Sequence, residues 1–337
     1  MKALVYTGVE TLEYRDVADP VVPEGYQLIR VESAGICGSD MHAYHGHDAR
    51  RPAPLVLGHE AAGTVVQGQM SGQRVTINPL VACGTCARCV AGEDNLCGSR
   101  QIISMPPREG SFAQYVAMPA GNLVVMPDHV STDQAALAEP IACGWHTVRL
   151  CLERLGAQPA TNGMKALVLG GGAIGVGAAL SAMAQGVTDV KIVEPNAPRR
   201  AFIAEAGIAP AVRGTDDLEP IYDMIIDGVG YPTTRAAASA LTRPGGVIGH
   251  IGLGSADGGL DIRRMTLQEI TFIGTYTYTA EDFRQTAQAI FDGRLGALNW
   301  TQTRPLENGA KAFADIDAGT AQSPKIILKP NHEKGES

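Results

Sequence analysis

The chain has 337 residues, of which 45% are hydrophobic and 18% charged, and it carries 40 glycines and 20 prolines. This composition excludes a disordered chain and indicates a globular protein that is rich in turns. The formal net charge of −8 argues against a nucleic-acid partner, since no basic run offsets the acidic excess. Acidic residues precede any apolar run of signal-peptide length, so we expect a cytoplasmic protein with no membrane partner.

Short predicted strands interrupted by Gly and Pro fill the first part of the chain and indicate a β-rich domain. Two stretches of this part, ICGSDMH and LGHEAAG, contain Cys37, Ser39, Asp40, His42, His59 and Glu60. A cysteine beside a polar turn and a His–Glu pair between glycines are the ligand types of a zinc site that keeps one position open for substrate. The alternatives are turn residues for Ser39 and Asp40 and an exposed loop for His42.

Four of the seven cysteines follow within fifteen residues. Their spacing is C-x2-C-x2-C-x7-C, formed by Cys83, Cys86, Cys89 and Cys97. A chain of this length can bury a large core without cross-links, and an odd number of cysteines does not suit a disulfide scaffold. The spacing therefore predicts a closed, structural zinc site with four thiolate ligands. Reduced cysteines in a solvated loop are the alternative.

Glu139, in LAEPIACGWHTV, comes just before a change of pattern. It could complete the open zinc site from across a cleft between two domains. After it, KALVL (165–169) predicts a buried parallel strand that leads into GGGAIG and then into a helix of small residues. In this G-x-G-x-x-G pattern, Gly170 permits the tight turn, Gly172 lets a pyrophosphate approach and Gly175 permits close packing of helix on strand.

A second predicted strand, 190–193, ends at Glu194, which lies 24 positions after Gly170. An acidic residue near this distance accepts the adenosine ribose hydroxyls and repels a 2′-phosphate, so Glu194 favours NAD over NADP. Arg199 and Arg200 complicate this choice, because a cation could serve either cofactor. Further strands near 222–226, 247–251 and 270–274 continue an alternation of strands and helices that predicts a parallel sheet.

Together these motifs resemble the zinc-dependent medium-chain dehydrogenases/reductases of the alcohol dehydrogenase superfamily, most of all the polyol branch around sorbitol dehydrogenase. The resemblance extends from Met1 to about Lys329. It implies an α/β fold with a GroES-like β-rich catalytic domain over 1–140, a Rossmann doubly wound parallel-sheet domain over 141–276 and a return to the catalytic domain over 277–337. It also implies a homodimer or a homotetramer.

The resemblance implies roles for single residues as well. Cys37 and His59 match the ligands of the catalytic zinc, Glu60 matches a glutamate that binds this zinc or exchanges with water, and the four-cysteine loop matches the structural zinc lobe. Glu139 stands where the ethanol-oxidising branch has a cysteine, which favours a polyol or another secondary alcohol as substrate.

The remaining implied roles concern proton transfer and the cofactor. Ser39 would hydrogen-bond the substrate oxygen, His42 would pass the proton to solvent, and Asp40 would orient His59. Arg199 is a candidate for the nucleotide, and Lys325 falls where the family places a basic residue on the cofactor pyrophosphate. Some relatives also have an arginine there at the position of Gly38, so Lys325 would provide this contact alone.

A rival hypothesis is a non-catalytic, redox-responsive regulator that binds zinc and NAD. Such a protein needs the glycine motif and the four-cysteine loop, but not Cys37, Ser39, His42 and His59 together. A zinc-free quinone reductase of the same fold would lack the open-site ligands. Arg50 and Arg51 are candidates for contacting a substrate carboxylate or phosphate, although arginines in exposed loops are usually only solvated.

Overall fold

A computed structural model describes residues 1–156 and 163–330, so residues 331–337 of the last predicted segment lie outside the described residues. The chain divides into two units. Unit one comprises Met1–Glu139, Phe283–Asp292 and the chain from Thr301 onward, and unit two comprises Pro140–Asp282 and Gly293–Trp300. The sequence predicted boundaries after residues 140 and 276, and no motif indicated that 293–300 returns to unit two.

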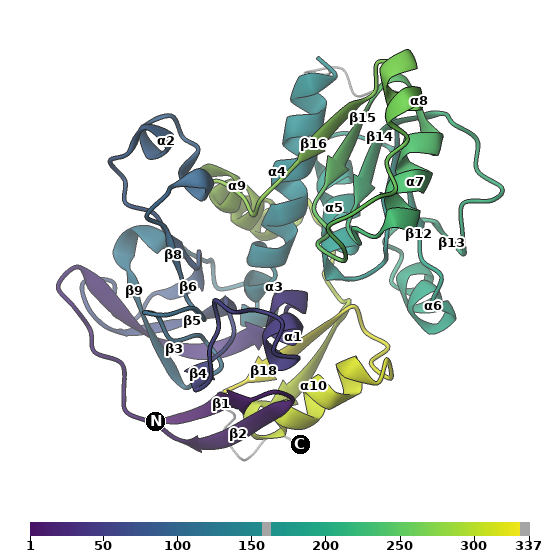
Figure 1. Cartoon of the computed structure of the whole chain (residues 1–337). Helices are drawn as coiled ribbons and strands as arrows, with labels where there is room; N and C mark the ends of the chain where they lie inside the picture. The colour runs from purple at the N-terminus through teal and green to yellow at the C-terminus, as the bar shows by residue number, and fades with distance from the viewer. Residues whose placement is uncertain (157–162, 331–337) are drawn as a thin grey trace. The chain divides into compact units, whose positions relative to one another are not determined.

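The main sheet of unit one is formed by strands from both ends of the chain (Figure 1). Its order is β10 (Leu123–Val125), β6 (Arg74–Ile77), β5 (Glu60–Gln67), β3 (Tyr26–Gly35), β18 (Lys325–Lys329) and β17 (Thr301–Pro305), and β9 (Tyr115–Pro119) also pairs with β3. The smaller sheets are β2 (Thr11–Asp16), β1 (Lys2–Gly8) and β4 (Leu55–Val56), and β7 (Leu80–Val81) with β8 (Gln101–Ile102). The late strand β18 therefore lies beside the early strand β3.

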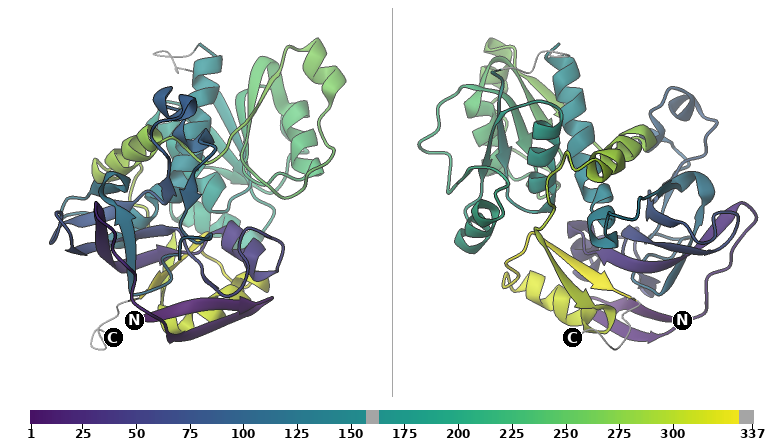
Figure 2. Two further views of the ribbon diagram at one scale, coloured as in Figure 1. Left: turned by 60° about the vertical axis from the view of Figure 1, so that its left-hand side comes forward. Right: turned by 180° about the vertical axis from the view of Figure 1, so that it is seen from behind.

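Short helices connect these strands. They are α1 (Gly38–Tyr44), α2 (Ala87–Val90), α3 (Thr132–Ala136), α10 (Gly309–Asp317) and the single turns η1 (Asp94–Leu96), η2 (Ala120–Asn122) and η3 (Leu306–Asn308). The core of the unit combines Leu4 of β1, Ile29 of β3 and Phe313 of α10, all fully buried. Figure 2 shows from two further sides how β1 and β2 lie against α10.

Unit two contains the predicted parallel sheet, and the doubly wound α/β prediction is confirmed. Its order is β13 (Ala211–Val212), β12 (Asp189–Val193), β11 (Lys165–Leu169), β14 (Tyr222–Asp227), β15 (Thr242–His250) and β16 (Thr271–Gly274), with every pair parallel. The helices are α5 (Ala173–Ala184), α6 (Ala197–Glu205), α7 (Pro232–Leu241) and α8 (Ile262–Leu267). This strand order reverses direction at β11 and β14, where such sheets bind dinucleotides at the carboxyl ends of the strands.

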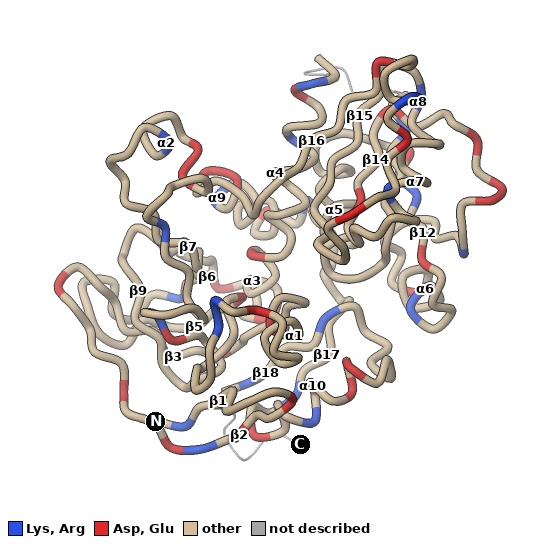
Figure 3. Tube along the Cα trace, in the orientation of Figure 1, with Lys and Arg blue, Asp and Glu red and all other residues tan. Residues whose placement is uncertain are grey.

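Charges are distributed without segregation: Figure 3 shows Lys and Arg interspersed with Asp and Glu along the described trace. No helix among the described residues is long and apolar enough to cross a membrane.

A buried polar network in unit two joins α4 (Ala138–Arg154) to the first turn of α9 (Ala280–Phe291). The Asp282 carboxylate lies 2.7 Å from His146 Nδ1 and accepts hydrogen bonds from Arg149 Nε at 2.7 Å and Thr279 Oγ1 at 2.7 Å. Burial alone would raise the pKa of Asp282, but the hydrogen bonds from His146, Arg149 and Thr279 hold it well below its usual range. The ionised carboxylate therefore stabilises this junction.

We expect Asp282→Asn to lower the free energy of unfolding by about 3 kcal/mol at pH 7, because it removes the buried anion that pairs with the partly buried Arg149. The stabilisation is full above the pKa of an unfolded aspartate, about 4, and is lost as the pH falls toward the lower folded-state pKa. The difference between the two proteins should thus shrink below about pH 4 in urea titrations. Glu153→Gln removes an exposed partner of the same arginine and should cost less than about 1 kcal/mol. Equal losses in both variants would contradict this account.

Candidate catalytic and structural metal sites

Three predicted metal ligands converge in unit one. Cys37 caps the N-terminus of α1, while His59 and Glu60 stand where β5 begins. A sulfur, a ring nitrogen and a carboxylate oxygen of these three residues all lie within 4.8 Å of one another. The pairing of β3 with β5 explains the convergence, since Gly35 at the end of β3 is opposite Glu60. A Cβ on Gly35 would lie 2.0 Å from Glu60 Oε2, so a larger residue here would displace the Glu60 carboxylate.

The donor set suits zinc in an open site. Thiolate, imidazole and carboxylate are the three ligand types that zinc accepts, and three protein ligands leave a position for substrate. Neither Cys37 nor any of the other six cysteines is in a disulfide. The residues present therefore fit a catalytic zinc.

Asp40 connects the two segments that carry these ligands. The carboxylate is fully buried, accepts a hydrogen bond from Cys37 N at 3.0 Å and another from Gly58 N at 3.2 Å, and lies 3.5 Å from His59 Nδ1. Burial opposes the charge of His59, yet Asp40 and Cys37 raise the pKa of this imidazole well above its usual value. Asp40 thus lies where the sequence predicted it, beside His59, and it also fixes the backbone on both sides of the site.

The two residues expected to move protons lie on α1. Ser39 is half-buried, and its Oγ is 3.5 Å from His59 Nε2. His42 follows one helical turn later and is exposed. Within the described structure no hydrogen bond joins Ser39 to His42, so a relay between them requires a bridging group such as a water molecule.

Lys325 differs from its predicted place. The ammonium is buried and donates to Glu60 Oε1 at 2.6 Å, to Glu60 Oε2 at 2.7 Å and to Ile36 O at 2.8 Å. Burial opposes its charge, but Glu60, Cys37 and Glu139 raise the pKa of Lys325. All three N–H groups are in use, so a contact with a pyrophosphate would require the pair with Glu60 to break.

Glu139 is buried and lies outside the group formed by Cys37, His59 and Glu60. Its charge acts on Lys325, which therefore lies among two carboxylates and the Cys37 thiol. Of the two glutamates named as ligand candidates, Glu60 is the one that meets the other ligands in this structure.

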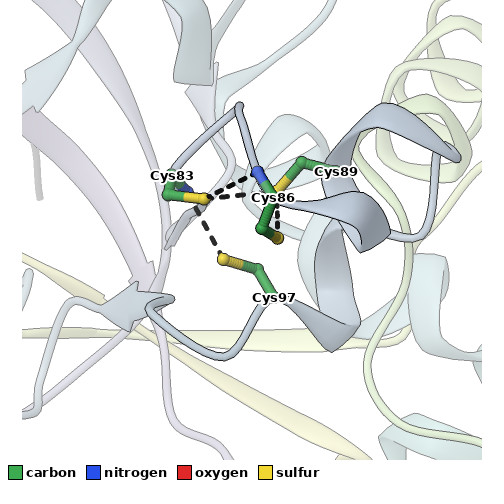
Figure 4. A group of neighbouring side chains, drawn as sticks. All are labelled: Cys83, Cys86, Cys89 and Cys97. Atoms are coloured by element: carbon green, nitrogen blue, oxygen red, sulfur yellow. Dashed lines mark hydrogen bonds between the residues drawn. The ribbon is translucent and has the colours of Figure 1, made fainter.

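The four-cysteine loop also gathers into one cluster (Figure 4). Cys86 Sγ is 3.5 Å from Cys89 Sγ, and Cys83 N donates to Cys97 Sγ at 3.5 Å. Backbone N–H groups of Thr85 and Cys86 lower the pKa of Cys83 to about 6, whereas burial and the bond with Cys86 raise the pKa of Cys89 to about 12. Converging thiols that form no disulfide fit a tetrahedral zinc, which would hold all four as thiolates.

The glycine motif has the geometry that its spacing predicted. Gly170 adopts a positive φ of 99° at the turn after β11, and a Cβ on Gly175 would lie 1.8 Å from Gly170 O. A Cβ on Gly172, which caps α5, would meet nothing within 4 Å. The backbone is therefore tightly packed at Gly175, where the helix meets the strand. At Gly172 there is space for a pyrophosphate to approach the helix N-terminus.

Glu194 lies beside this motif. Its buried carboxylate accepts hydrogen bonds from Gly171 N at 2.9 Å and Asn196 N at 2.7 Å, and Arg199 lies 3.5 Å from it. Arg200 instead donates to the carbonyl of Glu194 at 2.7 Å. Both arginines thus contact Glu194, Arg199 at its carboxylate and Arg200 at its backbone carbonyl.

Arg51 was named with Arg50 as a candidate for contacting an anionic substrate, or else as a solvated loop residue, and the structure shows it buried. The side chain is buried and contacts Ser39, Asp48 and Ser104, whereas Arg50 beside it is exposed. The one signal in the sequence was the spacing of three between Asp48 and Arg51, which permits an ion pair.

Comparisons with known proteins cover most of the chain. The family described as "Alcohol dehydrogenase GroES-like domain" matches residues 23–128, and the family described as "Zinc-binding dehydrogenase" matches residues 173–292. The first range contains both clusters of candidate metal ligands, and the second contains Gly175, the last glycine of the motif, and Glu194.

Relatives of known activity match along the same length. The chain is 31% identical to 2-dehydro-3-deoxy-L-galactonate 5-dehydrogenase of Pseudoalteromonas atlantica over 93% of this chain and 94% of that protein. It is 30% identical to sorbitol dehydrogenase of Arabidopsis thaliana over 80% and 79%. The solved structure of acetophenone reductase from Geotrichum candidum in complex with NAD has a TM-score of 0.85 at 25% identity and covers 97% of this chain and 96% of its own. The chain therefore belongs to the zinc-binding alcohol dehydrogenases with a GroES-like domain, in the branch that resembles sorbitol dehydrogenase.

Proposed function

We propose that this protein transfers a hydride from a secondary alcohol group of a polyol or sugar-derived alcohol to NAD, with zinc at Cys37, His59 and Glu60. The observation that carries the proposal is the convergence of these three ligands within 4.8 Å, with the Ser39 hydroxyl 3.5 Å from the imidazole of His59. A protein that only binds zinc and NAD has no need of a hydroxyl at this place. The similarity to a sorbitol dehydrogenase and a sugar-acid dehydrogenase supports a polyhydroxylated substrate.

The side chains of unit one have separate tasks in this proposal. When bound, zinc supplies a Lewis acid that lowers the pKa of an alcohol hydroxyl, and NAD accepts the hydride. Cys37, His59 and Glu60 hold the metal, and Asp40 orients His59. Ser39 accepts the proton of the alcohol as its own proton moves outward. His42 passes that proton to solvent, because an exposed imidazole can both accept and donate.

Glu194 supports NAD as the cofactor. Its carboxylate lies beside the glycine motif, where a 2′-phosphate would meet a negative charge. Arg199 already lies 3.5 Å from this carboxylate. The Glu194 carboxylate can instead accept hydrogen bonds from the free ribose hydroxyls of NAD.

A second zinc at the four-cysteine cluster belongs to the same proposal, which gives two zinc ions per chain. The family resemblance further supports a homodimer or a homotetramer. Light scattering of the purified protein distinguishes these two states from a monomer.

The proposed function is tested by NAD reduction against a panel of polyols, simple secondary alcohols, sugar acids and sugar-alcohol phosphates, with NADP as second cofactor. We expect turnover with NAD, and a loss of at least about 100-fold in Cys37→Ser, since even changes around metal ligands cost 10- to 100-fold. Cys143→Ser is the matched control, because Cys143 lies in α4, outside both clusters, and its loss should leave turnover unchanged. Binding of NAD without turnover of any alcohol would favour the regulator hypothesis.

Zinc content separates the two metal sites. We expect two zinc ions per chain in the wild type and one in both Cys37→Ser and Cys97→Ser, measured with a colorimetric chelator after denaturation. Only Cys97→Ser should also lower the melting temperature strongly, because a closed zinc site contributes folding energy directly. Two zinc ions in Cys97→Ser would show that the cluster is not a metal site.

Lys325→Met tests the pair with Glu60. Removing the cation leaves the Glu60 carboxylate buried and uncompensated, so we expect a loss of about 3–5 kcal/mol in the free energy of unfolding after chelation of zinc. The loss should be smaller with zinc present, because the metal then compensates the carboxylate. Lys329→Met, on the same strand but with the more exposed partner Asp133, should cost less than about 1 kcal/mol with or without zinc. An equal loss of unfolding free energy in Lys325→Met with and without zinc would mean that Glu60 is not a zinc ligand.

A further inference from the structure

Arg51 is a buried cation beside the proposed proton-accepting serine. The guanidinium is 2% exposed, and Nη1 donates to Ser39 O at 3.2 Å while Nη2 lies 3.5 Å from Ser39 Oγ. Ser39 Oγ is also 3.5 Å from His59 Nε2. One side chain thus contacts both the backbone and the hydroxyl of the residue next to the metal ligands.

The position of Arg51 is fixed from the opposite side. Nε donates to Ser104 O at 3.0 Å and lies 3.3 Å from Ser104 Oγ, and Nη1 lies 2.8 Å from Asp48 Oδ2. Ser104 is fully buried, and the Asp48 side chain is 8% exposed. Because these partners hold both edges of the planar guanidinium, Arg51 cannot turn away from Ser39 without breaking several buried hydrogen bonds.

The chemistry of the guanidinium determines how the Ser39 hydroxyl can act. Arginine has only donors, so Ser39 Oγ must accept from it. A hydroxyl oxygen has two lone pairs, and filling one of them leaves the other to accept the proton of the alcohol while the hydroxyl hydrogen points away. The fixed cation also favours the negative charge that develops nearby during proton transfer.

We propose that Arg51 is a positioning residue for alcohol oxidation, which holds the Ser39 hydroxyl in the orientation that accepts the proton of the substrate. This role rests on the proposed function, because Ser39 has a proton to accept only if an alcohol is oxidised. Arg51 reaches the site through its contacts with Ser39, and its charge also acts on the Asp40 carboxylate.

Arg50 provides a matched control. It precedes Arg51 and pairs with the same Asp48 carboxylate at 2.8 Å, but its side chain is 61% exposed. Arg50→Gln therefore removes an equal charge from the same loop without touching Ser39.

The experiment measures kcat and KM for the best alcohol of the panel and for the same alcohol deuterated at the reacting carbon, with NAD as cofactor. The zinc-replete variants are Arg51→Gln, Arg51→Lys and Arg50→Gln. We expect Arg51→Gln to lower kcat by about 10- to 100-fold with KM changed less than about threefold, as for the loss of other groups that orient an active site. The isotope effect on kcat should rise as the chemical step becomes limiting. Arg51→Lys should recover part of kcat, and Arg50→Gln should match the wild type.

A double-mutant cycle with Ser39→Ala separates positioning from a merely structural role. If Arg51 acts through the hydroxyl, Arg51→Gln should have little further effect on kcat once the hydroxyl is gone. If Arg51→Gln folds poorly, Arg51→Lys takes its place in the cycle.

Three results would overturn the inference. If Arg51→Gln has the kcat and the isotope effect of the wild type, the contact with Ser39 makes no contribution to catalysis. Additive losses in the cycle would show that Arg51 only supports the loop. A wild type that binds NAD but oxidises no alcohol would remove the proposed function, and this role of Arg51 with it.

Discussion

The buried ion pair between Glu60 and Lys325 is the interaction on which the catalytic site depends. The two residues are 265 positions apart, and they meet because β18 inserts beside β3, whose other edge pairs with β5. A carboxylate can remain ionised in such a buried place only with a cation or a metal next to it. The last described strand of the chain therefore borders the proposed metal site, although it holds none of the proposed ligands.

This pair also limits what Glu60 can do. Both of its oxygens accept hydrogen bonds from Lys325. The negative charge that Glu60 offers to a metal is therefore already partly neutralised. Glu139 contributes a second negative charge near the same ammonium. A divalent cation at Cys37 and His59 would add positive charge beside these two carboxylates.

Short-range motifs explain how much of this could be predicted from sequence. The cysteines of the loop lie within fifteen residues, and the glycine motif with Glu194 lies within one strand–helix–strand unit, so spacing alone fixed their geometry. Lys325 was interpreted as a contact of the cofactor and Arg51 as a candidate contact of the substrate. Nothing near either residue in the sequence reveals the protein groups that each one contacts. Ser104, which anchors Arg51, is 53 positions away, and such a contact depends on how strands pair.

Arg50 and Arg51 show why the sequence could not distinguish a solvated arginine from a buried arginine that contacts the site. They are adjacent, carry the same charge and share Asp48, yet one side chain is 61% exposed and the other 2%. Burial restricts Arg51 to one arrangement, and that arrangement ends at the Ser39 hydroxyl. Asp40, on α1, lies 3.5 Å from His59 Nδ1 and is itself fixed by hydrogen bonds from the backbone N–H groups of Cys37 and Gly58. The proposed proton acceptor Ser39 and the proposed metal ligand His59 each lie beside one buried, charged side chain, and such neighbours help a site on short loops to keep the fixed geometry that catalysis requires.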